Sequence, residues 1–432
     1  MISRPTHLKK LIDRKKNGLV KVITGVRRCG KSVLLFDLFF RHLIESGVRD
    51  SQIIRIKLDN ADFASLRNPL KLLEHIRKQI AEEEEYYLFI DEIQFVKKIK
   101  NKDLEGDHIT FYDILNSLMG IPNLDIYITG SNSRMLSKDI LTEFRGRGDE
   151  VRVYPFSFRE FHDAKQGDKE RDLDEFMLYG GMPLVLSRPT AEAKISYLQN
   201  LFEETYLKDI VERNRVQNQN LLGSLTNEIC SATGSLTSPN SLTRAINSEQ
   251  KNKKENEVSV NTVTSYLNHL ENAFLFREAK RYDIRGKRYF SNTSKYYCVD
   301  VGLCNARLNM RQNEYTHIME NVVYNDLVKR GFSVDVGVLE TFSKDGNGKT
   351  IRIDREIDFV VNRGNFQCYI QSAFRMDEER MAASELAPFK AVENSFKKIV
   401  VTRFESSPWY DDNGIYHIGL ADFLLAGDEL FS

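Results

Sequence analysis

The stretch Gly25-Val-Arg-Arg-Cys-Gly-Lys31-Ser32 decides the fold of the N-terminal part of this chain. It fits the pattern G-x-x-x-x-G-K-S/T, with an apolar segment, Leu19–Thr24, leading into it and a helix expected from Ser32. In this context, backbone N–H groups of the loop and of the helix N-terminus can cradle phosphates. The sequence therefore predicts a phosphate-binding loop for ATP. Its eight residues are Gly25, Val26, Arg27, Arg28, Cys29, Gly30, Lys31 and Ser32.

Two side chains of this loop and two carboxylates have predicted catalytic and metal-binding roles. Lys31 would reach the β- and γ-phosphates, and Ser32 would bind Mg²⁺. Tyr86-Tyr-Leu-Phe-Ile-Asp91-Glu92 is typical of a buried strand that ends in two acids. Asp91 would complete the Mg²⁺ shell, and Glu92 would orient or deprotonate the attacking water. ATP and Mg²⁺ are the expected cofactors and ATP hydrolysis the expected reaction.

Another apolar strand, Leu124–Thr129, is followed by Gly130-Ser-Asn132. If this strand lies between the other two, Thr129, Ser131 or Asn132 would face the γ-phosphate as a sensor. A Gly-Ser-Asn turn with no such role explains the same residues.

Two arginines, Arg145 and Arg147, follow in a Gly-containing stretch. An arginine can stabilise the charge on a transferred phosphoryl group in cis or from a neighbouring subunit. Arg147 is our candidate for such a finger, which would act between copies of a homo-oligomer if it acts in trans. A solvated basic loop is the alternative for each arginine.

Cys29 lies inside the loop, between Arg28 and Lys31 and near a helix N-terminus. Such surroundings lower the pKa of a thiol and increase its reactivity. We therefore expect alkylation of Cys29 to inhibit ATP binding, with a small residue chosen for its size as the alternative.

Composition limits the class of protein. The 432 residues contain 62 basic and 62 acidic side chains, so any surface that attracts nucleic acid must be local. Five scattered cysteines do not form a disulfide framework. The N-terminal residues lack the apolar core of a signal peptide, and no run of 18 apolar residues occurs. We expect a cytoplasmic protein that does not contact membranes.

The spacing of apolar segments predicts an α/β fold. Residues 18–160 alternate strands with helices, which is typical of a parallel sheet covered on both faces. The expected strands are Leu19–Thr24, Ile53–Leu58, Tyr86–Ile90, Leu124–Thr129 and Val151–Tyr154. The expected helices are Ser32–Glu45, Pro69–Glu84 and Thr110–Met119.

After residue 160 the pattern is mainly helical, with a polar loop expected at Ile246–Glu257. Helix Glu320–Arg330 then precedes a second group of strands. These are Val334–Leu339, Ile351–Val361, Gln367–Gln371 and Lys398–Thr402.

The middle of the chain contains a candidate DNA reader at residues 259–290. Ser259 would cap a helix over Val258–Asn272 that resembles the second helix of a helix-turn-helix. Its buried stripe would be Val263, Leu267 and Leu270. The polar side chains opposite would suit contacts with double-stranded DNA. These are Asn261, Thr262, Thr264, Ser265, Asn268 and His269.

The stretch Phe276–Phe290 predicts a basic hairpin that turns near Gly286. Helix and hairpin together suggest a winged helix, with the hairpin on the DNA backbone. The alternative is a winged-helix lid that only packs on the ATPase core. The basic residues are Arg277, Lys280, Arg281, Arg285, Lys287 and Arg288.

Further motifs extend the pattern along nearly the whole chain. They are Phe89-Ile-Asp-Glu-Ile-Gln94, Ile128-Thr-Gly-Ser-Asn-Ser133, Gly146-Arg147, Pro155-Phe-Ser-Phe-Arg-Glu160, Gly180-Gly-Met-Pro183 and Glu356-Ile-Asp-Phe359. With the phosphate loop they resemble a prokaryotic AAA-type ATPase family whose members carry a C-terminal domain of unknown function with a nuclease-like fold. The resemblance implies a P-loop ASCE ATPase core near the archaeal and signalling ATPases. In that branch a Gly-x-Pro loop contacts adenine, which makes Pro183 an adenine-side candidate.

The resemblance also implies a restriction-endonuclease-like C-terminal domain. PD-(D/E)xK nucleases hold Mg²⁺ with a helix Glu, a strand Asp and an E-x-K on the next strand. Here Glu320 lies on a helix, and Asp354, Glu356 and Asp358 alternate along a strand, but Gln371-Ser-Ala373 replaces the third element. We expect Glu320 and Asp358 to lie close together at one end of a small mixed sheet, with Gln371 beside them. The missing acid and lysine argue against full nuclease activity.

The predicted division is a P-loop core at 1–160, a helical lid or linker at 161–220, a winged helix at 221–310 and a nuclease-like domain at 311–432. The favoured function is an ATP-dependent switch acting on DNA or a protein partner. The alternatives are an ATP-regulated Mg²⁺-dependent nuclease and a signalling ATPase whose C-terminal domains bind only protein.

Overall fold

A computed structural model describes residues 2–130, 146–253, 256–311, 314–344, 350–374, 379–392, 395–404 and 407–431. The chain forms two compact units. Unit 1 comprises Met1–Tyr154 and Asn272–Phe274, and unit 2 comprises Pro155–Glu271 and Leu275–Ser432.

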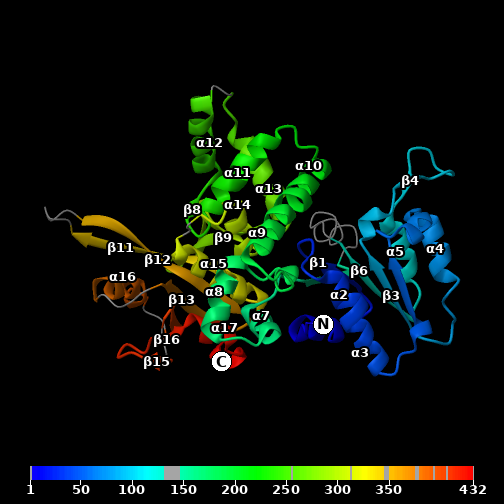
Figure 1. Cartoon of the computed structure of the whole chain (residues 1–432), viewed down its shortest axis with the longest axis horizontal. Coiled ribbons are helices and arrows are strands. Elements are labelled where there is room, and N and C mark those ends of the chain that lie inside the picture. The colour runs from blue at the N-terminus through cyan, green and yellow to red at the C-terminus, as the bar shows by residue number, and fades with distance from the viewer. Residues whose placement is uncertain are drawn as a thin grey trace. The chain divides into compact units, whose positions relative to one another are not determined.

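Unit 1 is built on a five-stranded parallel sheet (Figure 1). The order of its strands is β2-β3-β6-β1-β7. Its strands are β1 Val20–Thr24, β2 Ile53–Lys57, β3 Tyr86–Asp91, β6 Leu124–Thr129 and β7 Gly148–Arg152. The predicted parallel sheet is confirmed, although the last strand begins three residues earlier than expected. Strand β6 lies between β1 and β3, which is the condition set for a γ-phosphate sensor on that strand.

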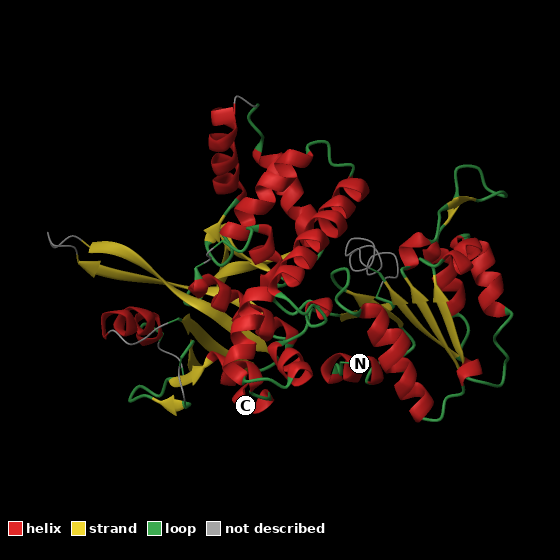
Figure 2. Cartoon of the chain, viewed as in Figure 1, coloured by secondary structure: helices red, strands yellow, loops and turns green. Residues whose placement is uncertain are grey.

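Alternation along the strands gives the sheet two apolar faces, and helices cover both (Figure 2). Val22, Ile90 and Ile128 belong to one core cluster together with residues of α4 and α5. The intervening Phe89 and Tyr127 pack against phenylalanines of the helical run 31–45 on the other face. The helices and short strands of unit 1 are α1 Pro5–Ile12, α2 Lys31–Val33, a π-helical segment Leu34–Phe39, α3 Phe40–Glu45, α4 Pro69–Arg77, β4 Ile99–Lys100, β5 His108–Ile109 and α5 Phe111–Met119.

Helix α4 ends at Arg77, seven residues before the predicted end. Four consecutive glutamates, residues 82–85, follow soon after, and their mutual repulsion disfavours another helical turn.

Unit 2 joins a group of helices to a nine-stranded mixed sheet. The strand order is β15-β16-β14-β13-β12-β11-β9-β10-β8. The strands are β8 Leu236–Thr237, β9 Phe276–Asp283, β10 Arg288–Cys298, β11 Ser333–Lys344, β12 Thr350–Arg363, β13 Phe366–Ala373, β14 Lys397–Thr402, β15 Trp409–Tyr410 and β16 Tyr416–Gly419. The helices are α7 Phe158–Lys165, α8 Lys169–Tyr179, α9 Ala191–Asn200, α10 Lys208–Asn214, α11 Gln219–Ser231, α12 Pro239–Lys253, α13 Val260–Asn272, α14 Val301–Arg307, α15 Tyr315–Lys329, α16 Glu379–Lys390 and α17 Leu420–Leu425.

One sheet therefore spans the predicted boundary at residue 310. Strand β9 pairs with β10 in the antiparallel sense on one side and with β11 in the parallel sense on the other. The hairpin predicted as the wing is thus part of a larger sheet. That sheet is also larger than the small one predicted for the C-terminal region.

The loop predicted at Ile246–Glu257 is wrong over most of its length, because helix α12 continues to Lys253. Leu242, Ile246 and Gln250 are spaced four residues apart and all three are buried. Burial of this stripe on one side stabilises the helix through a stretch that is otherwise polar.

Among the described helices, none is both long enough and apolar enough to cross a bilayer.

Candidate nucleotide-binding site

The loop after β1 adopts backbone conformations that favour anion binding. Gly25, Arg28 and Gly30 have φ values of 139°, 62° and 99°. A Cβ on Gly25 would lie 2.1 Å from the carbonyl oxygen of Val153, so only glycine fits there. Helical hydrogen bonding then begins with Leu34 N–H donating to Gly30 O at 2.9 Å. Left-handed residues next to a helix N-terminus turn backbone N–H groups into a concave site for phosphate.

Lys31 lies across this loop. Its side chain is buried, and its ammonium donates to the carbonyls of Gly25 at 3.0 Å and Val26 at 3.1 Å. Phosphate oxygens could replace these carbonyls as acceptors, with the added attraction of opposite charges. Within the same loop, Arg27 is half-buried and Arg28 is exposed.

Asp91 ends β3 as a buried carboxylate. It accepts hydrogen bonds from the hydroxyls of Thr129 and Ser32. Burial nevertheless raises the pKa of Asp91 above its ordinary value. A hydroxyl and a carboxylate are hard oxygen donors, and a cation beside them would relieve the cost of the buried charge. Ser32 and Asp91 therefore fit Mg²⁺.

Glu92 follows Asp91 with φ 54°, in the left-handed region. Its backbone N–H donates to Thr129 Oγ1 at 3.1 Å, and its carboxylate accepts from the Gln94 side chain. Thr129 thus contacts both acids at the end of the neighbouring strand.

The phosphate loop, the Asp91–Glu92 pair and Thr129 follow the carboxyl ends of three adjacent parallel strands. They consequently meet at one edge of the sheet, as α/β ligand sites do. Asp91 and Thr129 are 38 residues apart in the sequence, and this arrangement brings them into direct contact.

Arg147 is exposed and immediately precedes β7. Because β7 is parallel to β1, Arg147 lies at the amino ends of the strands, whereas Gly25 lies at their carboxyl ends. A strand of five residues separates these two ends by roughly 16 Å. The finger role therefore stays a prediction for a neighbouring subunit, and action on the nucleotide of its own subunit does not fit this placement.

Four other predicted residues cannot be placed at the site. Ser131, Asn132 and Arg145 lie outside the described residues. Pro183 begins a short 3-10 helix in unit 2, so its role beside adenine stays a prediction.

Cys29 is fully buried, and its Sγ donates to Val153 O at 3.4 Å. Burial shields this thiol from an alkylating reagent and so favours the size-based alternative, and the effect of alkylation stays a prediction. The side chain fills the space beneath the loop, as the size-based alternative proposed.

The sequence reasoning missed Arg4. This buried arginine donates to Cys29 O at 2.9 Å and to Tyr154 O at 2.7 Å. It thereby joins the phosphate loop to the last residue of the main segment of unit 1. An arginine before a Pro-initiated helix carries no local signal for such a contact.

In unit 2, the Gly180-Gly-Met-Pro183 loop is held by a buried acid, Asp300. Asp300 Oδ2 accepts the N–H of Gly181 at 2.6 Å. A Cβ on Gly180 would lie 2.0 Å from Asp300 Oδ1, which explains glycine at this position. Burial raises the pKa of Asp300 from its ordinary 3.8 to about 6.

The helix predicted over Val258–Asn272 is observed as α13, and its contact with DNA stays a prediction. Ser259 Oγ caps it by accepting Thr262 N–H at 3.2 Å, and Val263, Leu267 and Leu270 are buried as predicted. The six polar residues opposite are exposed or half-buried.

The basic hairpin is confirmed, but three of its arginines have partners within the chain. Arg288 Nε donates to Asp283 Oδ2 at 3.3 Å. Arg281 donates to Thr293 Oγ1 at 3.2 Å, and Arg285 donates to the carbonyls of Glu340 and Ala391. Arg277, Lys280, Lys287 and Arg288 have exposed side chains.

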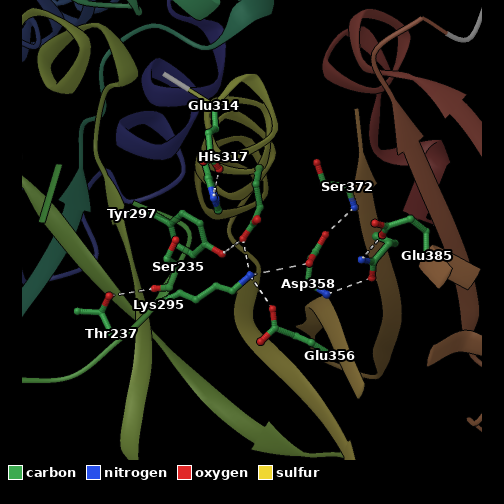
Figure 3. A network of polar contacts seen from close by, with 12 residues as sticks. Ser235, Thr237, Lys295, Tyr297, Glu314, His317, Glu356, Asp358, Ser372 and Glu385 are labelled. Atoms are coloured by element: carbon green, nitrogen blue, oxygen red, sulfur yellow. Dashed lines mark hydrogen bonds and ion pairs between the residues drawn. The ribbon is translucent and has the colours of Figure 1, made fainter. Parts of the chain in front are cut away.

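The C-terminal prediction that Glu320 and Asp358 lie together, with Gln371 beside them, is confirmed. Both acids contact one ammonium, that of Lys295, and Gln371 Oε1 accepts the backbone N–H of Asp358 at 3.3 Å. Figure 3 shows Lys295 reaching from its strand toward Glu356 and Asp358. The sequence reasoning missed Lys295, which lies on a strand far from the expected motif.

The charged groups of this cluster shift one another's pKa values. Burial lowers the pKa of Lys295, but the surrounding carboxylates outweigh burial and the pKa rises. Burial and the nearby Glu320 carboxylate raise the pKa of Asp358. Among the described residues, no three acidic, histidine or cysteine side chains are arranged to hold a metal ion. The cluster as it stands does not fit the Mg²⁺ that the nuclease resemblance implies.

Two models of known protein families match successive segments of the chain. Residues 17–162 match a family model described as AAA domain, and residues 170–314 match a domain of unknown function (DUF8612). An uncharacterized protein of Haemophilus influenzae is 33% identical, and the alignment covers 98% of this chain and 99% of that protein. The chain belongs to this family of AAA-domain proteins.

The AAA-domain protein also has an archaeal relative. The uncharacterized protein MJ1544 of Methanocaldococcus jannaschii is 25% identical over 96% of this chain and 86% of that protein. Unit 1 is accordingly an AAA-type P-loop ATPase domain built on a parallel sheet.

Two solved structures resemble the AAA-domain protein distantly. The Aeropyrum pernix ORC2 protein is 13% identical, covers 76% of this chain and 93% of its own, and has a TM-score of 0.38. AMPPCP-bound DnaA from Aquifex aeolicus is 16% identical, covers 63% and 89%, and has a TM-score of 0.27. Both TM-scores are low, so these similarities carry no conclusion about function.

Proposed function

We propose that this AAA-domain protein hydrolyses ATP and uses the cycle to change its binding of duplex DNA. The observation that supports hydrolysis is the meeting of Lys31, Ser32, Asp91, Glu92 and Thr129 at one sheet edge. A cation for the phosphates, two oxygen ligands for a metal and a base for water are all present there.

Each residue has a defined part in this reaction. Lys31 would exchange its loop carbonyls for β- and γ-phosphate oxygens. Ser32 and Asp91 would hold Mg²⁺, which supplies charge neutralisation at those phosphates. Glu92 would accept a proton from the attacking water, with its backbone fixed by Thr129.

DNA is favoured as the partner by the order of elements in unit 2. The sequence α11-β8-α12-α13-β9-β10, with strands in the spatial order β8-β10-β9, has the connectivity of a winged helix. Helix α13 would then be the reading helix, with exposed Asn261, Ser265 and Asn268. The exposed cations of the hairpin would contact phosphates.

The test measures ATP turnover with and without duplex DNA at low salt. DNA should raise the wild-type rate. Lys31→Ala should abolish nucleotide binding, whereas Glu92→Gln should keep binding and lose roughly 10²- to 10⁴-fold in turnover. Full turnover in Glu92→Gln would refute the role of that residue. An intact ATPase with no response to DNA would refute DNA as partner and favour a protein.

A further inference from the structure

The carboxylate cluster of unit 2 converges on a single ammonium. Lys295 Nζ on β10 lies 2.8 Å from Glu320 Oε1 on α15 and 2.7 Å from Glu356 Oε1 on β12. Asp358 Oδ1 lies 3.9 Å away. The Lys295 side chain is only 5% exposed, so its charge is balanced by these acids and not by water. Figure 3 shows the ammonium between the strands and the helix that supply them.

The other contacts of these acids also come from the protein. Tyr297 Oη donates to the same oxygen of Glu320 that contacts Lys295. Asp358 Oδ2 accepts the backbone N–H of Ser372 at 2.8 Å. These donors take some of the lone pairs of the two carboxylates, and the Lys295 ammonium takes the position among the acids that a metal ion would need.

The amide of Gln371 is likewise occupied. Its Oε1 accepts from Asp358 N–H, and its Nε2 donates to Glu385 Oε2 at 2.8 Å. An amide in this position offers neither charge nor a free oxygen to a hard cation.

We propose that the Lys295 ammonium is a built-in cation that takes the place of a divalent metal ion among Glu320, Glu356 and Asp358. The nuclease-like resemblance implies a metal there, and the residues present exclude it. The C-terminal half of unit 2 is then a metal-independent module whose charge centre joins β10 to α15 and β12. This inference does not depend on the ATPase proposal.

Removing the ammonium should convert the cluster into a metal site. Lys295→Met leaves the carboxylates facing one another without their cation, which favours a hard cation with oxygen ligands. Tb³⁺ is a suitable probe, because Tyr297 is hydrogen-bonded to Glu320 and can sensitise its luminescence. All proteins carry Ser32→Ala and are free of nucleotide, so that the phosphate loop contributes no metal ligand.

The expected result is saturable Tb³⁺ luminescence in Lys295→Met at a concentration at least tenfold below that needed by the protein with Lys295. Mg²⁺ or Ca²⁺ should compete for this site. The signal should disappear when Asp358→Asn is added. Lys280→Met is the matched control, since it removes an exposed lysine from the paired strand β9 and should gain no site.

Two results would overturn the proposal. One is Tb³⁺ binding by the protein with Lys295 that Asp358→Asn removes, because the cluster would then accept a metal beside the ammonium. The other is a folded Lys295→Met protein that gains no binding. If Lys295→Met does not fold, Lys295→Gln replaces it, and the comparison with Asp358→Asn in the Lys295 background still decides. Mg²⁺-dependent cleavage of DNA, lost in Asp358→Ala, would contradict the proposal independently.

Discussion

The hydroxyl of Thr129 accepts the backbone N–H of Glu92 at 3.1 Å while donating its own proton to Asp91. One side chain on β6 therefore positions both acids that end β3. We expect Thr129→Val to lower ATP turnover roughly 10- to 100-fold, as loss of a supporting contact to metal ligands does elsewhere, with nucleotide affinity little changed. Steady-state ATPase rates and binding of a fluorescent ATP analogue measure the two effects. Thr129→Ser keeps the hydroxyl and should retain most activity, and equal losses in both variants would contradict this role.

Gly25 is predicted to tolerate no side chain. Gly25→Ala would place a Cβ 2.1 Å from Val153 O at φ 139°, and the loop must shift to relieve this clash. Strain of about 1–3 kcal/mol corresponds to roughly 5- to 150-fold weaker ATP binding. Gly47→Ala is the control, because Gly47 also has positive φ, 90°, but open space around it. That change should reduce stability and leave ATP affinity intact. Equal ATP affinities of Gly25→Ala and wild type would contradict the cradle.

The basic hairpin gives a salt-dependent prediction. Lys287 is exposed, and the Arg288 side chain is 69% exposed. If both contact phosphates, Lys287→Gln with Arg288→Gln should weaken DNA binding and flatten its salt slope by roughly two units. Arg285→Gln should leave the slope unchanged, because Arg285 donates to carbonyls of its own chain. Fluorescence anisotropy of labelled duplex at several salt concentrations distinguishes the variants, and an unchanged slope in the double variant would reject phosphate contact.

Asp300 should make unit 2 less stable as pH rises. Its pKa is about 6 in the fold against 3.8 ordinarily, so between these values the folded state binds more protons than the unfolded state. Stability therefore falls as pH rises from about 4 to above about 6. Asp300→Asn can still accept Gly181 N–H but does not titrate, so the stability difference from wild type should change across this range. Urea unfolding followed by the fluorescence of Trp409, the one tryptophan of the chain, reports on unit 2. Parallel pH profiles for the two proteins would contradict the assignment.

Local patterns predicted much of unit 1. The phosphate loop is eight consecutive residues, and each strand is a short run of apolar residues that is recognisable in the sequence. The five strands and their parallel sheet could therefore be predicted from the sequence. Helix α12 was mistaken for a loop because its buried stripe, Leu242, Ile246 and Gln250, is short and contains a polar residue. To predict that Arg147 lies at the amino ends of the strands, away from the phosphate loop, one needs the order and direction of the strands.

Contacts between distant parts of the chain could not be predicted in this way. Arg4 reaches a residue 150 positions away, and Asp300 reaches one that is 119 positions away. Lys295 on strand β10 contacts Glu320 on helix α15, which is 25 positions away. A lysine in an alternating strand is ordinarily a solvated side chain, and its sequence neighbours give no sign of the acids it meets.

The sequence by itself determined that this protein has a phosphate loop, a strand ending in two acids and a C-terminal set of acids, because each depends on neighbouring residues and on strand or helix periodicity. Tertiary structure alone decided what those groups do together. It placed Thr129 between the two acids, buried Cys29, incorporated the basic hairpin into a larger sheet and put the Lys295 ammonium among the carboxylates. The physical reason is that burial and charge pairing depend on which strands become neighbours, and that choice depends on packing of the whole chain.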